Sequence, residues 1–146
     1  MKKSISPSST IKEFKAVVSN LPVVQDYVKS IMSDLGCGKQ MISSIDVAVE
    51  EVFVNIASYG YEEDAQYRPC WVESGEADGY FYLAFKDKGK PYNPLEKEDP
   101  VIGDPDRMTI GGYGIFMVKT IADEVTYEYD NEEGLNILIM KEKIIK

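Results

Sequence analysis

The amino-acid sequence predicts an α+β fold, a two-layer sandwich in which about three helices cover one face of a mixed β-sheet. Three observations lead to this prediction. Two stretches before residue 60 repeat apolar residues with the period of an α-helix. Two pairs of aromatic and β-branched runs are each separated by a short turn sequence, as in β-hairpins. The 146 residues are the size of a single domain, which we expect to span the chain, and they contain no internal repeat.

The predicted elements follow one another along the chain. Residues 1–10, rich in serine, are expected to be flexible. Pro22 stands where a first helix can begin, and this helix ends before Gly36. The other expected elements are strands near 11–19, 66–74, 79–86, 124–130 and 135–143, a turn at 75–78, and helices over 40–58 and about 112–122.

The helix of residues 40–58 carries two polar residues away from its apolar stripe. Glu51 and Asn55 lie one turn apart, about 40° from each other around the helix axis and nearly opposite the stripe. A carboxylate and a carboxamide at this spacing form a small oxygen-rich pair. Such a pair alone is typical of a solvated helix face, so its interpretation depends on motifs downstream. The stripe consists of Ile42, Ile45, Val49, Val52, Phe53 and Ile56.

A second motif follows the strand of residues 79–86. Asp87 leaves the strand end into a turn, and Gly89 allows the backbone there to come close to a flat ligand. Pro91 and Pro94 stiffen the segment that follows. On its own, Asp-x-Gly is also an ordinary turn sequence.

A third motif is the glycine-rich run at the start of the helix near 112–122. Gly111, Gly112 and Gly114 leave backbone N–H groups free at the positive end of that helix, where a phosphate can approach. The sequence has no GxxxxGK[ST], and no GxGxxG follows a strand. A nucleotide site in this chain would therefore be of another type.

In this order and spacing, the three motifs resemble those of GHKL-type ATPase domains. More narrowly, the chain resembles the anti-sigma regulatory factor family of serine/threonine protein kinases, from about Ile11 to Lys143. Residues 48–61 are similar to the family's Glu-x-x-x-Asn helix, residues 87–94 to its Asp-x-Gly-x-Pro adenine box, and residues 111–118 to its Gly-Gly-x-Gly phosphate box.

The resemblance implies a role for each matching residue. Glu51 would be the general base that activates the attacking hydroxyl, and Asn55 would ligate Mg²⁺, a cation that prefers oxygen donors. Asp87 would accept a hydrogen bond from the adenine amino group of ATP. Gly89 would let the adenine ring lie close to the backbone.

The same resemblance assigns the phosphate end of the site. Gly111, Gly112 and Gly114 would donate N–H groups to the phosphates. Residues 95–110, which have little apolar periodicity, would be the mobile lid over the nucleotide.

The sequence departs from the family pattern at two positions. Many relatives carry a threonine near the adenine in the last strand, and this position aligns with Ile139. Ser58-Tyr59 stands where some relatives have a histidine. Because Ile139 cannot supply the polar contact of the family threonine, it affects the expected adenine affinity and leaves open whether kinase activity is retained.

Composition excludes several other classes of protein. With 25 acidic and 16 basic residues the net charge is −9, which argues against a nucleic-acid-binding surface. An acidic protein that binds a polyanionic nucleotide needs a cation, in agreement with Mg²⁺. The chain has no histidine, so it lacks histidine metal sites, Ser-His or Cys-His catalytic pairs, and the phosphorylated histidine of a sensor kinase.

Two cysteines and the absence of a signal peptide or an apolar span predict a cytoplasmic protein. Cys37 and Cys70 form no C-x-x-C motif and are expected to be free thiols in a reducing compartment. No stretch is long and apolar enough to cross a membrane.

The resemblance implies an ATP-dependent protein-serine kinase in a partner-switching pathway. Such a protein binds a sigma factor or a similar target and phosphorylates a serine on a small antagonist protein. Relatives often form homodimers, although no patch in this sequence can be assigned to that contact. Two alternatives stay open: a nucleotide-binding interaction module in which ATP only sets partner affinity, and a GHKL ATPase that drives a conformational cycle. Members of the latter class carry additional domains, for which this chain has no room.

Overall fold

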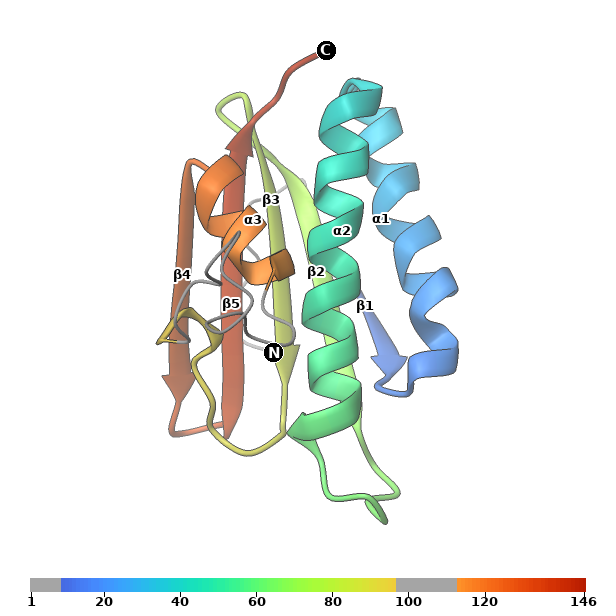
Figure 1. The fold of residues 1–146 in the computed structure, drawn as a ribbon, viewed down its shortest axis with the longest axis vertical. Coiled ribbons are helices and arrows are strands. Elements are labelled where there is room, and N and C mark those ends of the chain that lie inside the picture. The colour runs from blue at the N-terminus through green and yellow to red at the C-terminus, as the bar shows by residue number, and fades with distance from the viewer. Residues whose placement is uncertain (1–8, 97–112) are drawn as a thin grey trace, which may run out of the picture.

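A computed structural model describes residues 9–96 and 113–146 of the chain. The described strands form one five-stranded sheet in the order β1-β2-β3-β5-β4, and the helices lie on one face of it (Figure 1). The strands are β1 (Thr10–Lys15), β2 (Pro69–Ala77), β3 (Tyr80–Asp87), β4 (Glu124–Asp130) and β5 (Leu135–Lys143). The helices are α1 (Leu21–Asp34), α2 (Lys39–Asn55) and α3 (Tyr113–Ile121).

The predicted α+β sandwich is confirmed, with a difference in how its strands pair. Each pairing between described strands is antiparallel, whereas a mixed sheet was expected. The crossover through α3 does return the chain parallel to β3, as a mixed sheet would require. However, β5 pairs between β3 and β4, so these two parallel strands are not neighbours.

Local turn chemistry sets several element ends. Helix α1 ends at Asp34, two residues before Gly36, whose φ of +82° is accessible to glycine without strain. The first hairpin turns at Asp78 and Gly79, with φ of +55° and +85°, rather than at 75–78, so β2 runs on to Ala77. Strand β1 is shorter than the predicted 11–19, because a 3₁₀ turn follows at Val18–Asn20. The last two strands have the predicted bounds.

The end of α2 departs from α-helical geometry. After Asn55 the chain continues as a π-turn, η2 (Ile56–Gly60), where a continuous helix to residue 58 was expected. Such π segments are rare and are found frequently at functional sites. The turn brings the chain across the end of the sheet, toward the carboxyl end of β3 (Figure 1).

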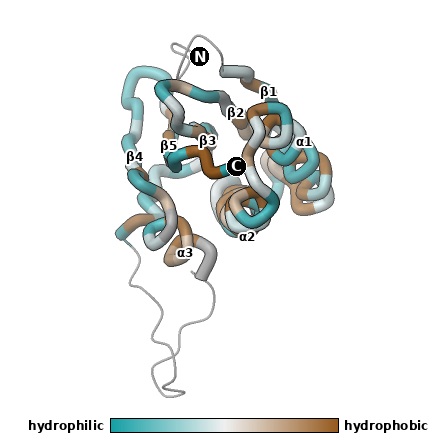
Figure 2. Tube along the Cα trace, turned by 90° about the horizontal axis from the view of Figure 1, so that it is seen from above, coloured by the Kyte–Doolittle hydropathy of each residue, from teal (hydrophilic) through white to brown (hydrophobic). Residues whose placement is uncertain are grey.

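The core lies between the sheet and the three helices, and its rows are set by the strand register. Seen from above, α1, α2 and α3 lie along the same side of the sheet (Figure 2). On this inner face Val72, Phe85 and Leu138 form one apolar row, and each of them is buried. The next row toward the end of the sheet is Cys70, Asp87 and Asn136. Asp87 of β3 and Asn136 of β5, both polar and buried, thus meet beside the C-terminal end of α2.

The chain start lies partly outside the described residues. Residues 1–8 of the predicted flexible segment are not among them, and Thr10 is the first residue of β1. Ser9 donates a hydrogen bond from Oγ to Glu73 at 2.7 Å. None of the helices described is long and apolar enough to span a membrane.

Candidate nucleotide-binding site

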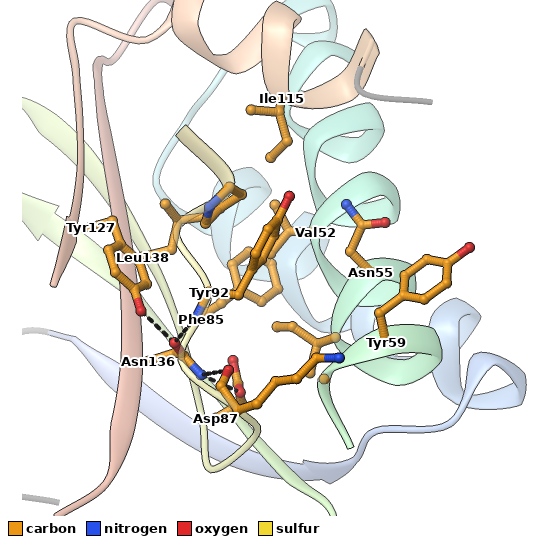
Figure 3. A pocket seen from close by; sticks show the side chains of 14 residues that line it. Val52, Asn55, Tyr59, Phe85, Asp87, Tyr92, Ile115, Tyr127, Asn136 and Leu138 are labelled. Carbon is orange, nitrogen blue, oxygen red and sulfur yellow. Dashed lines mark hydrogen bonds between the residues drawn. The ribbon is translucent and has the colours of Figure 1, made fainter. Parts of the chain in front are cut away.

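A pocket of about 330 Å³ opens between α2 and the ends of β3 and β5, a size typical of small-molecule sites (Figure 3). Its inner wall is apolar and comes from α2, the start of η2, the sheet and α3; it includes Val52, Ile56, Phe85, Ile115 and Leu138. Two tyrosines at the mouth are well exposed, Tyr59 at 69% and Tyr92 at 53%. The polar groups are concentrated in two places, on α2 and at the end of β3.

The polar pair on α2 is formed as expected from its spacing. Asn55 lines the pocket and donates a hydrogen bond from Nδ2 to Oε2 of Glu51, at 2.8 Å. An ionised carboxylate can only accept, so the amide nitrogen must face Glu51. The carbonyl oxygen of Asn55 then has no hydrogen-bond partner among the described residues. Glu51 is half-buried and does not itself line the pocket.

Asp87 lies at the inner end of the pocket and is 6% exposed. Its Oδ1 accepts two hydrogen bonds, from the N–H of Gly89 at 2.9 Å and from Nδ2 of Asn136 at 3.0 Å. Burial raises the pKa of Asp87 above its ordinary value, and these two hydrogen bonds oppose the rise. Its Oδ2 has no partner in the described part of the chain, which leaves one acceptor for a ligand.

Asn136 of β5 holds this end of the site together (Figure 3). Its Nδ2 donates to Asp87 and also to the carbonyl oxygens of Gly89 at 3.2 Å and Lys90 at 3.0 Å. Its Oδ1 accepts from the N–H of Tyr92 at 3.0 Å and from the hydroxyl of Tyr127 at 2.5 Å. Because the donor groups of Tyr92 and Tyr127 must face an oxygen, the orientation of the amide is fixed. Asn136 has no hydrogen-bonding capacity left for a ligand.

Gly89 lies in the turn between Asp87 and Lys90. It is buried behind the pocket and does not line it. A Cβ added to Gly89 would lie 2.4 Å from the carbonyl oxygen of Gly60, which accepts a hydrogen bond from the N–H of Lys90 at 3.0 Å. The glycine therefore allows the turn after β3 to pack on the end of the π-turn η2.

The position aligned with a family threonine, Ile139, lies away from the pocket. Ile139 pairs with Ala84 and Thr126, and side chains alternate between the two faces of a strand. Leu138 and Asn136 point to the pocket, so Ile139 points to the outer face. The polar residue that meets Asp87 from the last strand is Asn136.

The phosphate end of the predicted site is described only in part. Gly114 lies in the first turn of α3, and Ile115 beside it lines the pocket. Gly111 and Gly112, with residues 97–110 of the predicted lid, lie outside the described residues. The first two lid residues belong to a 3₁₀ turn at Pro94–Glu96, whose Pro94 also lines the pocket.

The described part of the chain has no ready-made cluster of metal-binding side chains. No group of three or more Cys, Asp or Glu residues among the described side chains is placed to hold a metal ion. Asn55, on the α2 wall, brings an amide oxygen to the pocket.

Comparison with known proteins identifies the family. The model of the histidine kinase-like ATPase domain matches residues 14–141, and the chain belongs to this family. The predicted GHKL-type ATPase domain is thus confirmed.

Within this class, the chain is similar to the serine-protein kinase RsbW of two Listeria species. It is 27% identical to the Listeria innocua protein over 140 residues, which cover 86% of this chain and 85% of that one. The Listeria monocytogenes protein is also 27% identical, over 149 residues with the same coverage. The crystal structure of the RsbU and RsbW domains of Rv1364c from Mycobacterium tuberculosis has the same fold, with a TM-score of 0.67 and 16% identity. That match covers 95% of this chain and 32% of the other.

Sequence reasoning missed the residues that build the turn after β3. Asn136 could have been found, because it occupies an inward position in a strand whose next inward residues are Leu138 and Met140. A polar residue in such a row requires a buried partner. Tyr61, whose hydroxyl accepts from the N–H of Lys88 at 2.8 Å, carries no comparable signal in the sequence.

Proposed function

We propose that this chain binds Mg-ATP in the pocket and phosphorylates a serine of an antagonist protein in a partner-switching pathway. The observation that carries the proposal is the arrangement of Asp87 and Asn55. A buried carboxylate with one unoccupied oxygen lies at the inner end of an apolar pocket, and an amide carbonyl lies on the helix that forms another wall.

The inner end of the pocket suits adenine. Oδ2 of Asp87 can accept one hydrogen bond, and the exocyclic amino group of adenine supplies such a donor. Guanine presents a carbonyl oxygen at the equivalent position, which would face the carboxylate as a second acceptor. Val52, Phe85 and Leu138 provide the apolar surface on which a flat base can pack. The pocket therefore favours adenine over guanine.

The α2 wall suits the phosphate end of the nucleotide. The carbonyl oxygen of Asn55 is a hard ligand atom of the kind that Mg²⁺ prefers. It is available to a metal ion because the hydrogen bond to Glu51 uses the amide nitrogen. Asn55 would hold Mg²⁺ there, and the bound ion would neutralise charge on the phosphate oxygens. Gly111, Gly112 and Gly114 are proposed to donate N–H groups to the phosphates from the start of α3, and residues 95–110 to cover them.

Glu51 is the proposed general base. A base must lie within hydrogen-bond reach of the hydroxyl that it deprotonates. The bond to Asn55 fixes one carboxylate oxygen of Glu51 beside the metal ligand and leaves the other oxygen to accept the serine proton. The serine would thus lose its proton to Glu51 as its oxygen attacks the terminal phosphate of ATP.

The proposed partners and cellular compartment follow from the family resemblance of the sequence. Two relatives are named serine-protein kinase RsbW, which supports a serine of a protein as the acceptor. We propose an antagonist protein as the phosphorylated partner and a sigma factor or similar target as the second one, in the cytoplasm. A homodimer is proposed on the same basis.

An interaction module without turnover is the second candidate, and one observation favours it. Glu51 does not line the pocket, and one of its oxygens is already bonded to Asn55. In this alternative ATP occupies the pocket and sets partner affinity, while no phosphate is transferred.

Incubation of the protein with γ-labelled Mg-ATP and a purified antagonist-type protein separates the candidates. Label on a serine of the partner would support the kinase. Nucleotide binding with an unlabelled partner would favour the interaction module. The absence of nucleotide binding would contradict both.

A further inference from the structure

The turn that carries Asp87 is held by a tyrosine that does not line the pocket. Tyr61 directly follows the π-turn η2, and its hydroxyl accepts a hydrogen bond from the N–H of Lys88 at 2.8 Å. The same hydroxyl donates to the carbonyl oxygen of Pro69, at the start of β2. Burial raises the pKa of Tyr61, so the hydroxyl keeps its proton at neutral pH and this donation persists. One side chain thereby joins three segments of the chain.

Arg68 holds Tyr61 in place. Its guanidinium carbon lies 5.5 Å from the centroid of the Tyr61 ring, within the range of a cation–π contact. The three nitrogens of the guanidinium donate to three backbone carbonyls, those of Ala16 at 2.9 Å, Ala57 at 2.7 Å and Glu62 at 3.2 Å. These carbonyls come from the segment after β1, from η2 and from the loop after η2. A lysine could not make this set of contacts.

Each amide of the turn is already used within the protein. The N–H of Lys88 donates to Tyr61, that of Gly89 to Asp87, and that of Lys90 to Gly60 at 3.0 Å. None of these N–H groups is available to a base. Within this turn, recognition of a base therefore depends on Oδ2 of Asp87, and hence on how well the turn holds that carboxylate.

We propose that Tyr61, fixed by Arg68, is a positioning residue that holds the Asp87–Lys90 turn in the shape in which Asp87 recognises adenine. The inference rests on the proposed function, because it assigns regulation of affinity at the same site. Lys88 is exposed, so water can replace the tyrosine hydroxyl on its N–H group. Removing this hydroxyl should therefore loosen the turn while the fold persists.

The test compares Tyr61→Phe with Tyr67→Phe in the full chain. Both variants lose one phenol hydroxyl, but Tyr67 is 62% exposed and lies outside the pocket lining. Dissociation constants are measured for Mg-ATP and for Mg-tripolyphosphate, which has no base. Hydrogen exchange of the Lys88 amide is measured without nucleotide, by NMR.

For Tyr61→Phe we expect the ATP dissociation constant to rise about 5- to 10-fold, the scale of one lost hydrogen bond, while that for tripolyphosphate is unchanged. Exchange of the Lys88 amide should accelerate by a similar factor. Tyr67→Phe should match the wild type in each measurement.

Several results would overturn the inference. Unchanged ATP affinity in a variant whose Lys88 amide exchanges faster would mean that the contact is structural only. Unchanged exchange would mean that Tyr61 does not hold the turn. A Tyr61→Phe protein that is unfolded at the assay temperature would assign the residue to the fold and not to the site. Wild-type protein that binds no adenine nucleotide would contradict the proposed function, and the exchange measurement would still decide whether Tyr61 holds the turn.

Discussion

At the scale of single residues, the two oxygens of Asp87 have different tasks. Oδ1 is bonded to Gly89 and Asn136, which fixes the orientation of the carboxylate. Oδ2 has no partner in the described chain and is the acceptor that we assign to adenine. Because the carboxylate is nearly buried, a hydrogen bond made there competes little with water and should discriminate strongly between bases.

Asp87→Asn tests this assignment. The amide can retain the contacts of Oδ1, but it presents an N–H₂ group where the carboxylate presented an acceptor. We expect ATP affinity to fall by about 10- to 100-fold, the scale of a hydrogen bond to a charged group, with little change for GTP. Asp34→Asn, an exposed carboxylate at the end of α1, is the matched control. Equal losses for ATP and GTP would remove Asp87 from base recognition.

The raised pKa of Asp87 predicts two pH effects of opposite sign. The charged form is disfavoured by burial, so this residue's contribution to stability is largest when it is protonated and is lost as the pH rises through its folded pKa. Adenine binding requires the carboxylate, so discrimination between ATP and GTP should weaken as the pH falls through the same pKa. Thermal unfolding and nucleotide titrations between pH 4 and 8 measure both effects. If the pH dependences of stability and of nucleotide discrimination were the same in Asp87→Asn as in the wild type, Asp87 would not be the titrating group.

At the scale of elements, the site is formed where three segments distant in sequence meet. The helix α2 brings Asn55 and Glu51, β3 brings Asp87, and β5 brings Asn136. Local patterns predicted the first two segments, because a helical period and an Asp-x-Gly turn are visible within a few residues. The contact of Asp87 with Asn136 spans 49 positions and depends on strand register, which the sequence pattern did not supply.

The antiparallel pairing of the strands and the packing of Gly89 against Gly60 were not predicted, for the same reason. Both depend on which distant segments become neighbours: β5 enters between β3 and β4, and Gly89 packs against Gly60. The fold class, the order of the elements and the last hairpin could be predicted, since each follows from local periodicity and turn residues.

Asn136→Ala tests the junction of β3 and β5. The substitution removes one of the two donors to Oδ1 of Asp87, and it removes the Asn136 contacts of the Gly89 and Lys90 carbonyls and of the Tyr92 N–H. We expect the free energy of unfolding to fall by about 2–3 kcal/mol, since several of these groups are buried. Chemical denaturation measures the loss. Asn131→Ala, an exposed asparagine in the turn between β4 and β5, should change stability little. A loss of similar size in both variants would show that the network contributes nothing specific.

At the scale of the whole molecule, the proposed function requires an acidic chain to bring an anionic nucleotide and a protein substrate together. The net charge of −9 opposes ATP binding unless a cation accompanies the nucleotide, which agrees with Asn55 as an oxygen donor. The exposed Tyr59 and Tyr92 flank the pocket mouth, where the serine of a partner would have to enter.

Glu51→Gln separates the kinase from the interaction module. The glutamine keeps the size of the side chain and a hydrogen bond to Asn55, but it cannot take a proton. We expect ATP affinity near that of the wild type and transfer to the partner serine lowered by about 10²-fold or more. Glu50→Gln is the matched control, because Glu50 is the neighbouring exposed acid on α2. If both variants transferred phosphate equally well, Glu51 would not be the base.

The most direct test of adenine recognition in this pocket is calorimetric titration of the full chain with Mg-ATP and with Mg-GTP under identical conditions. The free oxygen of Asp87 at this end of the pocket predicts that ATP binds at least about tenfold more tightly than GTP, the scale of one hydrogen bond to a charged group. Equal affinities for the two nucleotides, or no heat with either, would contradict the assignment of this pocket as an adenine-nucleotide site.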